Sequence, residues 1–536
     1  MCYRPVRGAT GVRGISCMAR QPPTMILSHA TVRTMDPHQP RAEAVALRHG
    51  RIVAVGSDAE VLPLRSHGTT IISCQGAALL PGFIDAHLHL RSYVSTLLGI
   101  DCRPPAVRSI HDLQTVLRDE ARRRPPGCWL VGHGYDDFAL AERRHPTRWD
   151  LDAVTPQHPV RLAHRSRHAW VCNSLALAQL GITDGFVPPP GGMVQRDPVS
   201  GQPTGLLIDM DGYLRSHLPP SIDPETFRQG VRRASHALLA AGVTAVLDAS
   251  VSNDLAAYRA FRAWTADGDL AVRIGLLLGA SALDEAVAGG ANIGEAESAC
   301  RVQGFKIRLD EGTGALYPPQ EVVNAQVWQA HRRGYPVAMH VLEPSALVSA
   351  LHAVRLAQER WPRRDVRHRL EHAALCPEAC LDELADLGVA VVTQPAFLWH
   401  HGPRYAAEID PAQQPWLYRV RSLLDRGIPV AGSSDAPVVP PRPLEGIAAA
   451  VTRRSADGQV IAPAERVDVE TALWLFTQGA AWACGWDAEV GSITPGKRAD
   501  MVLLEADPAG VAVHDIPHIP VQMTMVDGVV RYKAKR

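Results

Sequence analysis

Two histidines early in this sequence have the spacing of metal ligands. His87 and His89 directly follow the apolar segment 81–85. Side chains two residues apart on a strand point to the same side, so both imidazoles can bind one ion. Imidazole binds zinc and its neighbours among the transition metals, and a carboxylate can complete such a site. The pair therefore predicts a metal centre.

Three further residues of the same kinds lie far along the chain, each at or just past the end of an apolar segment. They are His340, His372 and Asp435. A single histidine among 23 is weak evidence, because most histidines are hydrogen-bonded groups at the surface or in the core. Five ligand-type residues that all fall at the ends of candidate strands are hard to obtain by chance. Together they indicate one shared site.

A lysine in an apolar segment adds to this set. The sequence has only four lysines among its 55 basic residues, and Lys306 lies in the apolar run 304–309. A salt-bridged or snorkelling amine is the simpler interpretation, but arginine could serve either purpose. Burial favours the neutral amine, which can add carbon dioxide to become a carbamate. Such an anion can bridge two metal ions about 3.5–4 Å apart. We therefore predict that Lys306 is N6-carboxylated.

The segments that carry these residues alternate with longer helical patterns, which is typical of a parallel α/β protein. Eight candidate strands favour a closed (β/α)8 barrel of the TIM type over an open sheet. The candidates are 82–87, 244–248, 272–278, 305–309, 337–340, 367–371, 389–393 and 429–432. In such a barrel the active site lies at the carboxyl ends of the strands, which is where the candidate ligands fall.

Short strands and turns fill both ends of the sequence and predict a small β-sandwich domain made of residues 25–80 and 488–536. The barrel then occupies residues 81–487. The gap between the first two barrel strands is too long for a simple crossover, so we expect an inserted subdomain at about 91–240. Residues 1–24 lack the apolar core of a secretory signal and are expected to be a disordered extension or an over-long start.

Composition limits the function classes. The hydrophobic fraction of 46% and the charged fraction of 21% are typical of a soluble globular protein. Basic and acidic residues number 55 each, and this balance gives no electrostatic basis for binding nucleic acid or an anionic membrane surface. No run of about 18 apolar residues could span a membrane. The ten scattered cysteines fit a reduced, cytoplasmic protein. The expected partner is a small-molecule substrate, and a homo-oligomer stays an open alternative.

The sequence resembles the amidohydrolase superfamily of metal-dependent hydrolases, and within it the YtcJ-like branch, amidohydrolase family 3. The resemblance covers nearly the whole chain from Met25 onward. The segments that carry it are 44–56, 81–89, 168–174, 191–192, 369–372, 432–437 and 491–500. It implies a barrel with a small β-sandwich, which agrees with the pattern of elements described above.

The resemblance also implies how the ligand set is divided between metal ions. His87 and His89 would bind one ion, and His340 and His372 would bind the second. Lys306 would bridge the two ions as a carbamate. The expected cofactor is therefore a divalent metal, with two zinc ions per chain.

Asp435 would bind metal as well and act as the general base. A divalent metal lowers the pKa of bound water from 15.7 towards about 7, so that hydroxide is available to attack a carbonyl carbon. Asp435 takes the proton and returns it to the departing nitrogen. The predicted reaction is hydrolysis of a C–N bond in an amide, an N-acyl or N-formyl compound, or a cyclic amide.

Substrate specificity is expected to come from the inserted segment and from the loops above the strand ends. The candidate residues are His168, Asn173, Trp399 and His400. For Trp399, simple packing is the alternative interpretation.

One departure from the branch supports a second hypothesis. Glu343 follows His340 in a His-x-x-Glu pattern similar to that of adenosine and cytosine deaminases, where the glutamate protonates a ring nitrogen. A mononuclear aminohydrolase of a heterocycle would use Glu343 in this way, although a glutamate at the start of a helix also accounts for it. A non-catalytic scaffold is the third hypothesis, and it is disfavoured because every expected ligand position is filled.

Overall fold

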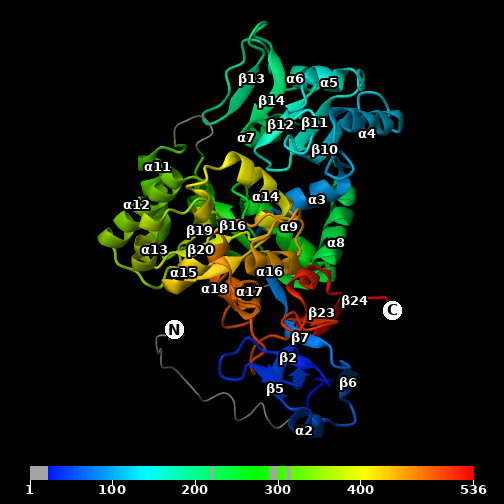
Figure 1. Cartoon of the computed structure of the whole chain (residues 1–536), viewed down its shortest axis with the longest axis vertical. Coiled ribbons are helices and arrows are strands. Elements are labelled where there is room, and N and C mark those ends of the chain that lie inside the picture. Colours follow the sequence, from blue (N-terminus) through cyan, green and yellow to red (C-terminus); the bar gives the residue numbers. More distant parts are fainter. Residues whose placement is uncertain (1–21, 219–221, 290–298, 311–315, 536) are drawn as a thin grey trace.

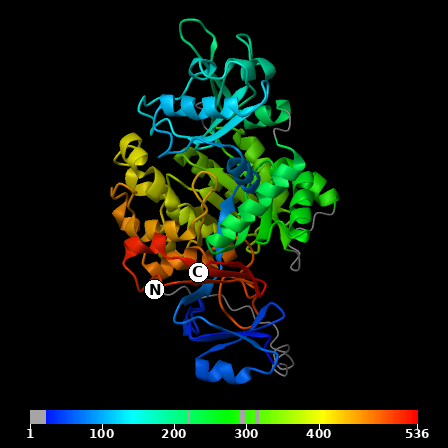
Figure 2. The same ribbon diagram turned by 90° about the vertical axis from the view of Figure 1, so that its right-hand side faces the viewer.

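A computed structural model describes residues 22–218, 222–289, 299–310 and 316–535. Figure 1 shows small sheets at the bottom, a barrel in the middle and a separate sheet at the top, and Figure 2 shows the same order from a perpendicular direction. Residues 1–21, most of the expected N-terminal extension, lie outside the described residues. Within the described ranges, no helix has both the length and the apolar character needed to cross a membrane.

The middle part contains, in the described residues, one sheet of eight parallel strands. In chain order these are β8 (Phe83–Leu88), β15 (Val243–Asp248), β16 (Arg273–Gly279), β17 (Cys300–Arg308), β18 (Val337–Val341), β19 (Arg369–His372), β20 (Ala390–Thr393) and β21 (Val430–Gly432). Each strand predicted from the sequence overlaps one of them, and consecutive strands are neighbours in the sheet. The predicted α/β fold with a (β/α)8 barrel is therefore confirmed.

The barrel nearly closes between its first and last strands. In the described residues β8 and β21 are the two ends of the sheet and form no ladder with each other. The segments just beyond them are nevertheless joined, because the Asp435 N–H donates to the His87 carbonyl over 2.8 Å. The His89 N–H likewise donates to the Ala436 carbonyl over 2.8 Å. This seam brings His87, His89 and Asp435 together from opposite ends of the barrel sequence.

The barrel strands are apolar because both of their faces are covered. All residues of β15 (VTAVLD) and β20 (AVVT) are buried, as expected for a parallel sheet packed on two sides. Asp223 and Asp254 cap the first turns of the helices that flank β15. The helices that alternate with the strands are α8 (Pro224–Ala240), α9 (Leu255–Ala266), α10 (Leu283–Ala288), α11 (Gln320–His331), α12 (Pro344–Arg360), α13 (Leu381–Leu387), α14 (Ala396–Glu408), α15 (Arg421–Asp425), α16 (Pro443–Thr452), α17 (Val469–Leu475) and α18 (Gln478–Ala483).

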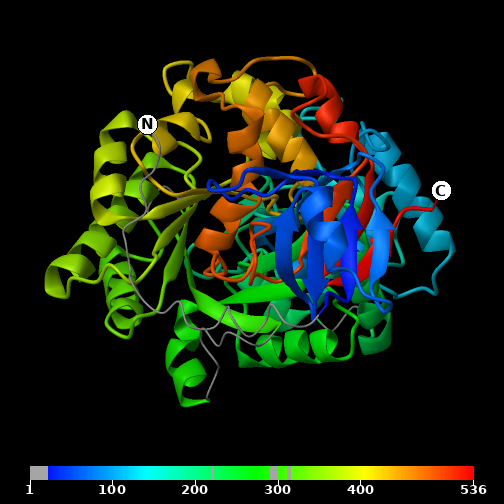
Figure 3. The ribbon, with the colours of Figure 1, turned by 90° about the horizontal axis from the view of Figure 1, so that it is seen from below.

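Both chain ends contribute to the small sheets below the barrel, as the view from below in Figure 3 shows. N-terminal β7 pairs antiparallel with C-terminal β22, with Ala78 opposite Leu504. This six-stranded sheet contains β2 (Thr31–Arg33), β3 (Arg41–Ala42), β7 (Ala78–Pro81), β22 (Met501–Leu504), β23 (Val521–Val526) and β24 (Val529–Lys533). A four-stranded sheet shares its core and contains β1 (Met25–Ser28), β4 (Ala44–Arg48), β5 (Arg51–Gly56) and β6 (Thr70–Ser73). The expected sheet with strands from both chain ends is present.

A separate sheet occupies the segment between β8 and β15, where an inserted subdomain was expected. Its strands are β9 (Ile100–Asp101), β10 (Leu130–Tyr135), β11 (Val160–His164), β12 (Ala169–Cys172), β13 (Met193–Arg196) and β14 (Pro203–Ile208). The helices of this segment are α3 (Leu90–Leu98), α4 (Ile110–Arg122), α5 (Arg148–Asp152), α6 (Ser174–Gln179) and α7 (Asp211–His217). Apolar cores lie on both faces of the sheet. This sheet stands over the barrel at the end opposite to the β-sandwich (Figures 1 and 2).

Candidate metal centre

His87, near the end of β8, is held by an acid from β19. Its Nδ1 forms a short hydrogen bond with the Glu371 carboxylate, and both side chains are fully buried. Arg369 donates two hydrogen bonds to the same carboxylate. Because an ionised carboxylate only accepts hydrogen bonds, the proton of the imidazole is on Nδ1. His87 therefore presents the lone pair of its Nε2 to the barrel mouth.

The same tautomer is set at His372 by an amide and a hydroxyl group. His372 Nδ1 lies 2.8 Å from Oε1 of Gln394. The Gln394 Nε2 donates to the Ser433 Oγ over 2.9 Å, which orients the amide so that its oxygen faces the imidazole. His372 therefore donates from Nδ1 and leaves Nε2 for a ligand.

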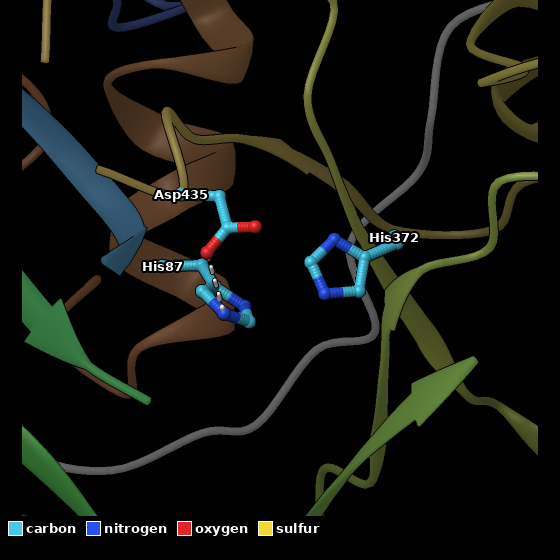
Figure 4. A group of neighbouring side chains, drawn as sticks. All are labelled: His87, His372 and Asp435. Atoms are coloured by element: carbon cyan, nitrogen blue, oxygen red, sulfur yellow. Dashed lines mark ion pairs between the residues drawn. The ribbon is translucent and has the colours of Figure 1, made fainter. Parts of the chain in front are cut away.

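Asp435, in the loop after β21, faces the two histidines at the end of β8. Its Oδ1 lies 3.5 Å from the His87 Nε2 and 3.1 Å from the His89 Nε2. Figure 4 shows the carboxylate directed toward His87, with the His372 ring on the far side. The ligand atoms of His87, His372 and Asp435 all lie within 4.8 Å of one another. Atoms this close together can surround bound metal.

Lys306 and His340 complete the cluster from the neighbouring strands β17 and β18. The ring centroids of His340 and His372 are 4.5 Å apart, and Lys306 lines the same cavity as both. The Lys306 side chain is 3% exposed, and the charges of Glu371 and Asp435 act on it. The structure thus brings together all six residues that the sequence predicts as ligands.

Burial keeps the imidazoles of this cluster neutral. It lowers the pKa of His87 to about 3, and it also lowers the pKa of His340 and of His372. Burial lowers the pKa of the Lys306 amine to about 8. At Asp435 burial opposes ionisation, but the neighbouring His89 and His87 imidazoles hold the pKa of the carboxyl well below its usual range. Neutral imidazoles and an ionised carboxylate are the protonation states that metal ligands require.

Four buried polar atoms of the cluster have no hydrogen-bond partner in the described part of the chain. They are Nε2 of His87, Nζ of Lys306, Nε2 of His340 and Oδ1 of Asp435. Buried polar atoms are nearly always hydrogen-bonded, so four unpartnered atoms in one cluster need an explanation. Imidazole nitrogen and carboxylate oxygen are the donors that divalent zinc and related ions prefer. The residues present therefore fit a divalent metal centre.

The backbone is strained at two of the ligand positions. His372 and Asp435 have φ angles of 72° and 56°, in the left-handed region that side chains other than glycine rarely adopt. The turn at Asp435 is held by buried Asp85, which accepts hydrogen bonds from the N–H and the Oγ of Ser434. Strain of this kind gathers at functional sites, where surrounding structure holds it in place.

A cavity of about 710 Å³ lies over the barrel mouth. Its floor includes His89, Lys306, His340, His372 and Asp435. The inserted segment forms the opposite wall with Trp129, Val131, His133, Arg161, Arg167, His168 and Trp170. A cavity of this size holds a small organic molecule.

Of the four residues expected to contact substrate, the structure brings His168 to the cavity. Its ring centroid is 5.7 Å from that of His340, and its Nδ1 lies 2.8 Å from Asp209 Oδ1. Arg308, two residues after Lys306 on β17, forms an ion pair with Asp209 as well. His168 thus lies beside an ion pair that joins barrel strand β17 to the inserted segment.

Asn173, Trp399 and His400 lie elsewhere. Asn173 caps α6, where its Oδ1 accepts from the backbone N–H groups of Val160 and Ala176, and its Nδ2 donates to a carbonyl. The Nε2 of His400, on α14, lies 2.9 Å from a carboxylate oxygen of Glu445 on α16. None of the three is among the described residues that line the cavity.

Glu343, the residue behind the deaminase hypothesis, is exposed and precedes the first turn of α12. It is absent from the described lining of the cavity. This position agrees with the alternative interpretation, in which Glu343 is an acid at the start of a helix, where the helix dipole favours negative charge.

Several residues that hold the centre in place were not predicted. Glu371, Gln394 and Ser250 each contact a candidate ligand, with the Ser250 Oγ 2.9 Å from the His89 Nδ1. For Glu371 a signal existed, because a carboxylate beside His372 in a fully buried strand needs a partner. Nothing local marks Gln394 or Ser250, because their contacts depend on how the strands pair.

Comparison with known proteins agrees with this geometry. Residues 70–532 match the family model described as "Amidohydrolase family". The chain is 31% identical to the N-substituted formamide deformylase of Arthrobacter pascens over 95% of this chain and 98% of that protein. It is 28% identical to the putative amidohydrolase YtcJ of Bacillus subtilis, over 94% and 98% of the two chains. An uncharacterised metal-dependent hydrolase from Pyrococcus horikoshii shares the fold with a TM-score of 0.73 at 23% identity, over 91% of this chain and 99% of that chain.

Proposed function

We propose that this chain, which belongs to the amidohydrolase family, hydrolyses a carbon–nitrogen bond of a small molecule with the help of bound metal. The observation that carries the proposal is the cluster of four unpartnered polar atoms at the barrel mouth. These atoms are buried and close together, and Lys306, His340 and Asp435 line a cavity of substrate size.

His87 and His89 would hold one divalent ion, and His340 and His372 a second one. Zinc is the expected metal, since it accepts imidazole and carboxylate ligands in hydrolytic sites. Metal bound there supplies an acidified water and polarises a carbonyl group. Metal analysis of the purified protein should find about two ions per chain, and one or none would contradict this assignment.

Lys306 is proposed to carry the carbamate that joins the two metal sites. The support is its burial, the lowered pKa of its amine and its unpartnered Nζ. Incubation with ¹³C-bicarbonate should give a carbamate carbon signal in NMR spectra. The signal should be missing in Lys306→Arg, which keeps a positive charge but cannot form the carbamate. A signal of equal size in both proteins would refute the assignment.

Asp435 is proposed as the group that moves the proton. Its lowered pKa keeps it ionised, so it can accept the proton of the attacking water. Transfer of that proton to the departing nitrogen then releases an amine, while the acyl carbon leaves as a carboxylic acid.

N-substituted formamides are the first substrates to test, because the relative with 31% identity is named for that activity. A panel of N-formyl amines, N-acyl amino acids, cyclic amides and aminoheterocycles should be assayed with the metal-loaded protein. Turnover of N-formyl or other amide bonds is the expected result. Ammonia release from aminoheterocycles, with no amide cleaved, would favour a deaminase instead.

A further inference from the structure

Two arginines of the inserted sheet lie against one tryptophan in the wall of the cavity. The Cζ of Arg161 is 4.8 Å from the centroid of the Trp170 ring, and the Cζ of Arg167 is 5.0 Å from it. All three residues line the cavity that contains Lys306, His340 and Asp435. The register pairs Ala163 of β11 with Trp170 of β12, so that Arg161 and Trp170 are on the same face of the sheet.

Neither guanidinium has a carboxylate partner. In the described residues no ion pair within 4.0 Å involves Arg161 or Arg167, although the chain pairs most of its buried arginines with acids. The Nε of Arg161 is buried without a hydrogen-bond partner in the described part of the chain. The Nη1 of Arg167 lies 3.0 Å from the Nδ1 of His133, a neutral acceptor.

The acid that acts on both guanidinium groups already has other partners. Asp211 attracts both guanidinium groups electrostatically. Its Oδ1, however, accepts from the indole nitrogen of Trp170 over 2.9 Å, and its Oδ2 lies 3.4 Å from Arg308. Arg161 and Arg167 also repel each other, and burial lowers the pKa of Arg167 to about 10. Two half-buried like charges close together are costly unless an anion joins them.

We propose that Arg161 and Arg167 bind a carboxylate of the substrate, so that the preferred substrate is an N-acyl or N-formyl compound with an acidic group. A planar guanidinium donates two parallel hydrogen bonds to a carboxylate, and two such groups can hold both of its oxygens. The inference rests on the proposed function only in placing the scissile bond at the metal centre.

The proposal explains why the anion site and the metal centre face each other across one cavity. A substrate held by its carboxylate on the inserted sheet would present its amide to Asp435 and Lys306 at the barrel mouth. Binding at a distance from the reacting atoms fixes the position of the bond to be cleaved.

A matched pair of substrates tests this directly. N-formylphenylalanine and N-formyl-2-phenylethylamine differ only in the carboxylate. We expect the wild-type, metal-loaded protein to favour the acid at least about tenfold in kcat/KM, because a site built for a polar group rejects an analogue that lacks it. In Arg161→Met this preference should fall by about 10–100-fold, and in Arg161→Lys by less. Equal turnover of the two substrates by the wild type would overturn the proposal.

Arg360→Met is the matched control. Arg360 lies 4.7 Å from the Trp328 ring centroid on the outside of the barrel, so this variant also removes one arginine from a tryptophan. It should keep the wild-type preference and metal content. Arg167→Gln serves as the second test if Arg161→Met does not fold, and an unchanged preference in Arg167→Gln would equally refute the proposal.

A binding measurement separates this proposal from the proposed reaction. Calorimetry with 3-phenylpropanoate and its amide, 3-phenylpropanamide, requires no turnover. Tighter binding of the acid that is lost in Arg161→Met, with metal content unchanged, supports the anion site even if no formamide is cleaved. Acid binding that is unaffected by Arg161→Met but abolished by chelation would place the anion on the metal and refute the proposal.

Discussion

Buried polar and charged groups differ in their partners between the two ends of the barrel. At the amino end, Arg273 is 2% exposed and forms ion pairs with Asp500 and Asp527 over 3.1 and 3.0 Å. Arg301 similarly pairs with Glu489 over 2.6 Å. At the carboxyl end, polar atoms of His87, Lys306, His340 and Asp435 are buried without hydrogen-bond partners in the described residues. Depth of burial is similar at both ends. The Nε of Arg273 also lacks a hydrogen-bond partner among the described residues, but two acids compensate the charge of its guanidinium group.

This contrast separates groups that hold the fold together from groups that await a ligand. The amino-end pairs join the barrel to the β-sandwich, and each charge there is compensated by another residue. The carboxyl-end residues are held in place by Glu371 and Gln394, but four of their polar atoms form no hydrogen bond within the described chain. A buried polar group without a partner destabilises the folded chain, so its retention indicates an external ligand.

Removal of metal should have the largest effect on turnover. If turnover did not change, the unpartnered atoms at the carboxyl end would not be metal ligands. Exhaustive chelation should abolish turnover of the best amide substrate, and added zinc should restore it, because the ligand atoms of the mouth then lack their ion. Turnover and metal content are measured on the same samples. Full activity in metal-free protein would mean that the unpartnered atoms serve another purpose.

Asp435→Asn should have the next largest effect. The amide has nearly the shape of the carboxylate but cannot accept the proton, so kcat should fall by about 10²–10⁴-fold. Metal content should stay measurable, since the histidines remain. Near-normal kcat in this variant would remove Asp435 from the proton-transfer role.

Arg273→Met tests the paired end of the barrel. It leaves Asp500 buried without its partner and should lower the free energy of unfolding by about 3–5 kcal/mol. The kcat of the folded protein should not change, because Arg273 lies at the far end of the barrel from the cavity. Urea denaturation and kcat measured on the same preparation would distinguish the two effects, and a large loss of kcat without a loss of stability would contradict the comparison.

Glu371→Gln tests a residue that is paired with an arginine and also contacts a candidate metal ligand. Glu371 is fully paired with Arg369, yet it also orients His87. Loss of such a carboxylate behind a metal-binding histidine costs about 10–100-fold in metal affinity or activity. Titration with zinc should show the weaker binding, and unchanged affinity would mean that the His87 tautomer is set by other contacts.

The smallest effect is expected at an exposed ion pair. Arg421 and Asp425, which lie 2.9 Å apart on α15, are 55% and 60% exposed. Arg421→Ala should therefore lower the free energy of unfolding by at most about 0.5 kcal/mol. It is the control for Arg273→Met, because both variants remove an arginine from an ion pair. Similar losses at the two positions would show that burial does not matter.

Much of the barrel could be predicted from the sequence because its strands are apolar on both faces. Such runs, separated by helical patterns, indicated the positions of all eight strands, and the ligand-type residues stood at their ends. The role of Asn173 could not be predicted in the same way. This residue was expected to contact substrate because it lies in the inserted segment, but its position before the helical stretch 174–179 is that of a capping residue, and the structure shows it in that role.

The sequence pattern was enough to predict the strand positions, the sheet formed by both chain ends and the candidate ligands. These depend on residue types and on spacings of two to four residues, which the chain carries in its order. Which charged groups have a partner depends on the tertiary fold and could not be predicted from local sequence. Glu371 reaches His87 across 284 positions, and Arg161 and Arg167 reach the barrel mouth only through the inserted sheet. Electrostatic energy depends on distance in space, and folding sets that distance independently of separation along the chain.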